Sequence, residues 1–257
     1  MVSQHKYAFG YFSSLLVKPT GTVYQITQDR PGFREIAIFL FSVGAARGII
    51  ELFWELLMAG QLGRTLSNPE LFRRQFLADG SILVLGNVTT AYVRWGMFAL
   101  IPFVLCRFLG SRVRFEVFLR LYGIVLGLFV VTLLPNFLYL FFKLPMLRFE
   151  VSEVYNPVFG IGQVLTSLAL IFITYKIARI AAGLPRWESL LVSPAIPLVN
   201  IGLLVLCSHI FFNLPAVMGL SHRKGLYIAA ACFVVATSAA VPILLWLGFR
   251  IDKMKRA

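Results

Sequence analysis

Long apolar runs, each about the length of a membrane-spanning helix, follow one another along this chain with short polar segments between them. A run of about 20 predominantly apolar residues is long enough to cross the hydrocarbon core of a bilayer as one helix. The predicted spans are Ile36–Met58, Val84–Cys106, Leu121–Phe142, Val158–Ile180, Leu191–Asn213 and Leu226–Phe249. The pattern therefore predicts an all-α fold, a polytopic transmembrane helix bundle with about six spans.

The segment before the first run has a different pattern. Between Tyr7 and Val17, aromatic and aliphatic residues are mixed with serines, and Lys6 and Lys18 flank them. This mixture predicts an interfacial amphipathic helix on the cytoplasmic leaflet, and a disordered aromatic tail is the alternative. The chain then divides into a cytoplasmic interfacial segment (residues 1–35), a six-span membrane domain (36–249) and a basic cytoplasmic tail (250–257).

Composition supports a membrane protein and changes how the charge is interpreted. The chain is 59% hydrophobic and 14% charged, whereas a soluble domain has about half apolar and a quarter charged residues. The net charge of +13 would suit a nucleic-acid partner, but the basic residues flank the apolar runs and no nucleic-acid motif accompanies them. The loops on the side of the membrane that carries the N-terminus hold more of these basic residues than the loops on the other side. The positive-inside rule therefore places both termini in the cytoplasm.

The first predicted span carries a stripe of charge. Arg47, Glu51 and Glu55 are spaced by four residues, so they share one helical face with Gly44 and Gly48. Charged groups in hydrocarbon are costly and normally face a protein interior or water. The glycines form a GxxxG pair that allows another helix to approach closely.

The second span offers a partner for that stripe. The two spans run antiparallel, which places Arg94 at about the depth of Arg47, and Asn87 near the depth of Glu55. Arg47, Glu51, Glu55 and Arg94 can then form a polar network with no net charge. We expect an internal structural lock between the first two spans. The alternatives are a solute- or proton-conducting site, a charge pair offered to a partner protein, and an acid/base pair.

Little else in the sequence indicates chemistry. The cysteines and histidines are scattered, and no P-loop or HExxH motif is present, so no metal, cofactor or catalytic residue is predicted. Gly123 and Gly127 in the third span form a small-residue face that is suited to helix packing or oligomers.

Two stretches carry a family resemblance. The first has LVKP at residues 16–19, VYQI at 23–26 and PGF at 31–33; the second runs from Leu109-Gly110 to Tyr122-Gly123 and on to Leu134-Pro135. Together they resemble the Yip1-domain family of multi-pass membrane proteins, over roughly residues 16–213. The resemblance implies a membrane organiser that works through partners and has no catalytic residues. The short N-terminal region is similar to that of the bacterial members, whereas the sixth span departs from the usual five.

The sequence thus predicts a non-enzymatic scaffold or accessory subunit of a membrane complex in the bacterial inner membrane. Its expected partners are the lipid bilayer and other membrane proteins or further copies of itself, and no nucleic acid. The main alternative is a transporter or permease-type subunit with a polar intramembrane site between the first two spans. A membrane-embedded enzyme that acts on lipid is a third hypothesis.

Overall fold

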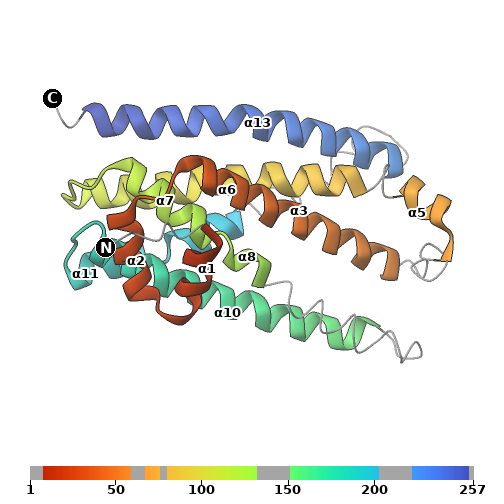
Figure 1. Cartoon of the computed structure of the whole chain (residues 1–257), viewed down its shortest axis with the longest axis horizontal. Coiled ribbons are helices and arrows are strands. Elements are labelled where there is room, and N and C mark those ends of the chain that lie inside the picture. The colour runs from red at the N-terminus through yellow and green to blue at the C-terminus, as the bar shows by residue number, and fades with distance from the viewer. Residues whose placement is uncertain (1–7, 59–66, 76–79, 132–150, 203–221, 255–257) are drawn as a thin grey trace, which may run out of the picture.

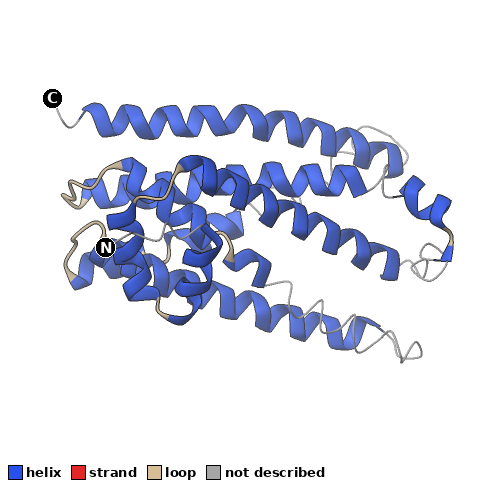
Figure 2. Cartoon of the chain, in the orientation of Figure 1, coloured by secondary structure: helices blue, strands red, loops and turns tan. Residues whose placement is uncertain are grey.

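The structure is a computed structural model that describes residues 8–58, 67–75, 80–131, 151–202 and 222–254 (Figure 1). Within these ranges the regular elements are helices, and no strand occurs among them (Figure 2). The predicted all-α class is therefore confirmed.

The long helices run lengthwise beside one another, with several short helices toward one end and the short helix Pro69–Gln75 at the other (Figure 1). Their bounds are α1 (Ala8–Val17), α2 (Pro19–Asp29), α3 (Phe33–Met58), α5 (Pro69–Gln75), α6 (Ser81–Phe108), α7 (Phe115–Val125), α8 (Leu128–Val131), α10 (Val151–Ile180), α11 (Arg186–Val192) and α13 (His222–Met254). Residues 195–202 are also helical.

Two of the described helices are long and apolar enough to cross a bilayer. These stretches are Phe33–Phe53 in α3 and Leu83–Phe108 in α6, by length and composition. The two helices pack against each other as an antiparallel pair, and α13 lies along α6. The pair α3 and α6 coincides closely with the first two predicted spans.

The third predicted span, Leu121–Phe142, is not one continuous helix. Helix α7 ends at Val125, a turn follows at Leu126 and Gly127, and α8 begins at Leu128. The amide of Gly127 donates to the carbonyl of Ile124 at 3.1 Å. This i to i−3 hydrogen bond is of the tighter 3₁₀ type and replaces the α-helical i to i−4 bond at the turn. The remainder, residues 132–142, lies outside the described residues.

The fifth predicted span, Leu191–Asn213, is also interrupted. Helix α11 ends at Val192, and a turn at Ser193 and Pro194 precedes the helix of residues 195–202. Proline has no amide hydrogen, so the helical ladder cannot pass through Pro194 intact. Residues 203–213 lie outside the described residues.

The fourth and sixth predicted spans lie within longer helices. Val158–Ile180 falls inside α10, and Leu226–Phe249 falls inside α13. Helix α13 continues to Met254, so residues 250–254 extend the last helix instead of forming a separate basic tail. Asp252, near its end, is buried.

The N-terminal segment forms two helices that pack into the core, where the sequence predicted one helix; its position at the membrane surface stays a prediction. Helices α1 and α2 pack against each other and against α7, and α2 also contacts α10. Tyr11, Leu15, Val23 and Ile26 are buried in these contacts. The hydroxyl of Tyr11 donates to Asp29 at 2.8 Å and joins the two helices.

Helix α7 is central to the packing. Its Phe115, Phe118 and Tyr122 are fully buried, and the indole Nε1 of Trp95 in α6 donates to the carbonyl of Leu119 at 2.6 Å. That hydrogen bond sets the position of α7 along α6, next to the middle of the α3–α6 pair.

Candidate functional site

The site begins with the close approach of α3 to α6. A Cβ placed on Gly44 would lie 2.6 Å from the Cα of Val88, and one on Gly48 would lie 2.5 Å from the Cα of Val84. No side chain fits at such separations, so only glycine allows the two backbones to meet here. The polar residues beside the glycines are thereby brought within hydrogen-bonding reach of α6.

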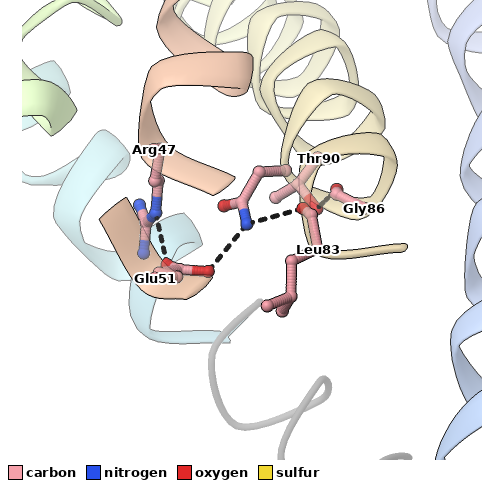
Figure 3. A network of polar contacts seen from close by, with 6 residues as sticks. Arg47, Glu51, Leu83, Gly86 and Thr90 are labelled. Atoms are coloured by element: carbon pink, nitrogen blue, oxygen red, sulfur yellow. Dashed lines mark hydrogen bonds and ion pairs between the residues drawn. The ribbon is translucent and has the colours of Figure 1, made fainter. Parts of the chain in front are cut away.

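Glu51 lies at the centre of the resulting polar cluster. The guanidinium Nε of Arg47 donates to Glu51 Oε1 at 2.9 Å, within one turn of α3 (Figure 3). From α6, the amide Nδ2 of Asn87 donates to Glu51 Oε2 at 2.7 Å, and also to the carbonyl of Leu83 at 3.0 Å. Each oxygen of the carboxylate therefore accepts a hydrogen bond from this chain.

The other two residues of the predicted network are Arg94 and Glu55. Arg94 is buried, with 8% of its surface exposed, and its guanidinium carbon lies 4.9 Å from the ring centroid of Phe129. Such a position over an aromatic face is favourable for a cation. Glu55 lies on α3, but its side chain is outside the described part of the structure.

A small cavity of about 20 Å³ lies beside Arg47, Asn87 and Arg94. It is lined by Val43, Gly44, Arg47, Asn87, Ala91, Arg94, Leu126 and Phe129. Its walls come from α3, α6, the turn after α7 and α8. A volume of this size holds roughly one water molecule and is too small for an organic solute.

The ion pair is not deeply buried. The side chains of Arg47 and Glu51 are 21% and 32% exposed. An ion pair between residues four apart on one helix contributes modestly to stability. Its main effect is to keep Glu51 hydrogen-bonded where the two helices touch.

The charges of Arg47 and Glu51 face each other within the cluster. Among the described residues, no group of three or more histidines, cysteines or carboxylates is placed to hold a metal ion. The arrangement mainly neutralises its own polar groups.

The depth predicted for Asn87 along α3 was wrong. Helical depth suggested a position near Glu55, whereas the structure pairs Asn87 with Glu51, one turn away along α3. The actual register follows from the glycine contacts, because Gly48 packs on Val84 and Gly44 on Val88.

A second charged contact was not predicted from the sequence. Arg107 at the end of α6 donates from Nη2 to Asp252 of α13 at 2.8 Å, and both side chains are buried. The same guanidinium donates to the carbonyl of Ser111 at 3.1 Å, and the Ser111 hydroxyl donates to the carbonyl of Ala182 at 2.8 Å. The one available signal was an acidic residue within an otherwise basic C-terminal segment.

The glycines of α7 and the turn after it pack within the chain. A Cβ on Gly123 would collide with Ile36 and lie 3.1 Å from Nε1 of Trp95, and one on Gly127 would lie 2.5 Å from Phe12 and 2.8 Å from Phe39. Gly123 and Gly127 therefore face this molecule's own interior.

Comparison with known proteins adds no relative. No family model, curated protein or solved structure matches the chain.

Proposed function

We propose that this protein is a multi-pass integral membrane protein that acts as a non-enzymatic scaffold or accessory subunit of a membrane complex. The support for a membrane location begins with α3 and α6, which have the length and composition to cross a bilayer. Large apolar side chains are also exposed on the outside of the bundle, including Phe41 in α3, Phe172 in α10 and Ile243 in α13. In water such a surface would favour aggregation, whereas in a bilayer it contacts lipid.

The observation that carries the scaffold proposal is the hydrogen-bonded polar cluster between α3 and α6. Both carboxylate oxygens of Glu51 are hydrogen-bonded to this chain, and the adjoining cavity is about 20 Å³. A cluster whose polar groups bond to one another at a close helix contact acts as a structural lock, because its charges stabilise one another. The small cavity beside it leaves little room for a substrate.

We place the protein in the inner membrane of a bacterial cell, with both termini in the cytoplasm. This orientation is supported by the arginines near the end of the molecule where α2, α11 and the C-terminal end of α13 lie (Figure 1). The resemblance to Yip1-domain proteins supports a role through protein partners, and it rests on the sequence stretches alone.

The scaffold proposal is tested by the state of the protein in native-like membranes. We expect cross-linking in the membrane, followed by light scattering of the full chain in mild detergent, to detect a homo-oligomer or a stable complex with other membrane proteins. A strictly monomeric protein that cross-links to no other membrane protein would overturn the scaffold role.

A transporter-type subunit is the second candidate, because the polar side chains of Arg47, Asn87 and Arg94 line a small cavity beside the first two long helices. Its discriminating measurement is solute or proton flux in proteoliposomes that contain the full chain. Flux that Glu51→Gln abolishes would favour the transporter. Absence of flux, together with normal cell growth of the Glu51→Gln variant, would exclude it.

A further inference from the structure

One end of the molecule collects exposed arginines from segments that are distant in sequence. This basic end is formed by the last turn of α2, the start of α3, the connection from α6 to α7, the end of α10, the start of α11 and the end of α13 (Figure 1). The residues used here are Arg30, Arg34, Arg112, Arg114, Arg179 and Arg250, and all of these side chains are exposed.

The carboxylates at the basic end do little to neutralise these cations. Asp252 is buried against Arg107, and Glu116 lies 3.9 Å from Arg120 on its own helix. The other carboxylates of these segments are Asp29, which is exposed and accepts the hydrogen bond of Tyr11, and the half-buried Glu35 and Glu188, so the six exposed arginines outnumber them. The exposed charge of the described residues at this end is therefore strongly positive.

Large apolar side chains are exposed beside the cations. Phe108 is 80% exposed at the end of α6, and Trp187 is 79% exposed in α11. On α13, the guanidinium of Arg250 lies 4.9 Å from the ring of Trp246, which is itself 57% exposed. Exposed tryptophan next to arginine is typical of the level where a membrane protein meets lipid headgroups.

From these observations we propose that the basic end binds the headgroups of anionic phospholipids. An arginine guanidinium can form two parallel hydrogen bonds with a phosphate, and the adjacent aromatic side chains lie at the depth of the upper acyl chains. An acidic protein segment would use the cations, but it would leave Trp187, Phe108 and Trp246 exposed to water. The combination of charge and exposed aromatics therefore favours lipid.

This inference rests on the proposed membrane location and is independent of the scaffold role. The two can fail separately, because the oligomeric state is measured without reference to lipid class. Lipid preference is measured on the purified chain whatever its oligomeric state.

The test compares two arginine pairs at opposite ends of the molecule. Arg112 and Arg114 lie exposed in the α6–α7 connection of the basic end, and Arg73 and Arg74 lie exposed in α5 at the other end (Figure 1). The full chain is equilibrated in micelles with equal amounts of phosphatidylglycerol and phosphatidylcholine, and the lipids that stay bound are counted by native mass spectrometry.

We expect wild-type protein to retain phosphatidylglycerol over phosphatidylcholine. A charge near an anionic surface is worth about 1 kcal/mol, so each arginine accounts for roughly a fivefold preference. The Arg112→Gln/Arg114→Gln variant is expected to lose at least about fivefold of the preference, and Arg73→Gln/Arg74→Gln to keep it. If the first variant does not fold, Arg30→Gln/Arg34→Gln tests the same surface.

Three results would overturn the proposal. Equal retention of the two lipids by wild-type protein would show no headgroup preference. An equal loss in the variants of both ends would show that the effect is general charge and not this surface. Tighter binding of poly-glutamate than of phosphatidylglycerol, lost in the Arg112→Gln/Arg114→Gln variant, would assign the surface to an acidic protein partner.

Discussion

Arg107 and Asp252 form an ion pair of 2.8 Å, although 145 residues separate them along the chain. Their side chains are 8% and 7% exposed, so the pair is shielded more completely than Arg47 and Glu51. Because Arg107 lies in the last turn of α6 and Asp252 near the end of α13, the contact holds the last helix against the second of the two long apolar helices.

Breaking this pair is expected to destabilise the protein strongly. Asp252→Asn leaves the Arg107 cation buried without its carboxylate, which costs about 3 kcal/mol or more of unfolding free energy. Thermal unfolding of the full chain in detergent measures the loss. The double variant Arg107→Met/Asp252→Leu removes both charges, and we expect it to recover most of the stability. A double variant as unstable as Asp252→Asn would contradict this account.

The α3 cluster supports a smaller effect, because its ion pair is partly exposed. We expect Arg47→Ala to lower the unfolding free energy by about 1–2 kcal/mol, since Glu51 keeps its hydrogen bond to Asn87 but loses its cation. Glu188→Ala in the first turn of α11 is the control, with an expected change within about 0.5 kcal/mol. Equal melting temperatures for the two variants would indicate a water-exposed cluster and favour the transporter hypothesis.

The α3–α6 contact depends on its two glycines. We expect Gly44→Ala and Gly48→Ala each to destabilise by about 1–3 kcal/mol, because the new methyl group would meet backbone atoms of α6 that cannot move aside. Gly86→Ala on the same pair of helices is the matched control, since nothing lies within 4 Å of its Cβ position. Alanine is the better helix former, so this control is expected to be neutral or stabilising. Melting temperatures rank the variants.

Arg30 has a backbone conformation that suits glycine. Its φ of 49° and ψ of 65° lie in the left-handed region, at the C-terminal cap of α2. Glycine adopts this region without steric cost, so Arg30→Gly is expected to stabilise the fold by about 0.5–1 kcal/mol. Arg30→Ala removes the same charge but keeps the Cβ, and we expect no gain from it. A similar stabilisation by both variants would attribute the effect to charge.

Tyr11 makes stability depend on alkaline pH. Burial, together with the hydrogen bond to Asp29, raises the pKa of Tyr11 above its usual value of about 10. The folded protein therefore holds the phenolic proton more tightly than the unfolded chain does. The stabilisation is complete below about pH 10, the unfolded value, and is lost as the pH rises above it.

The measurement for Tyr11 is urea or thermal unfolding at pH 9 and pH 11. We expect wild-type protein to lose more stability over this interval than Tyr11→Phe does. Tyr24→Phe, at an exposed position of α2, is expected to follow the wild-type protein. An identical pH dependence of wild type and Tyr11→Phe would show that the phenolic proton is not linked to folding.

The two long helices α3 and α6 could be predicted from the sequence to within a few residues. A continuous apolar run of this length satisfies its backbone hydrogen bonds within itself, so the local sequence is sufficient to define it. The break after Val125 could not be predicted in this way. The turn at Gly127 is packed against Phe12 and Phe39, and nothing in the run itself indicates those neighbours.

The same distinction applies to the candidate site. The proximity of Arg47 and Glu51 follows from the sequence alone, because residues four apart on a helix are neighbours. The pairing of Asn87 with Glu51, the placement of Arg94 over Phe129 and the Arg107–Asp252 contact were decided only by the tertiary structure. They depend on the register and rotation of one helix against another, and these are set by side-chain packing over the whole interface. Helical periodicity determines which residues share a face, whereas packing determines what that face meets.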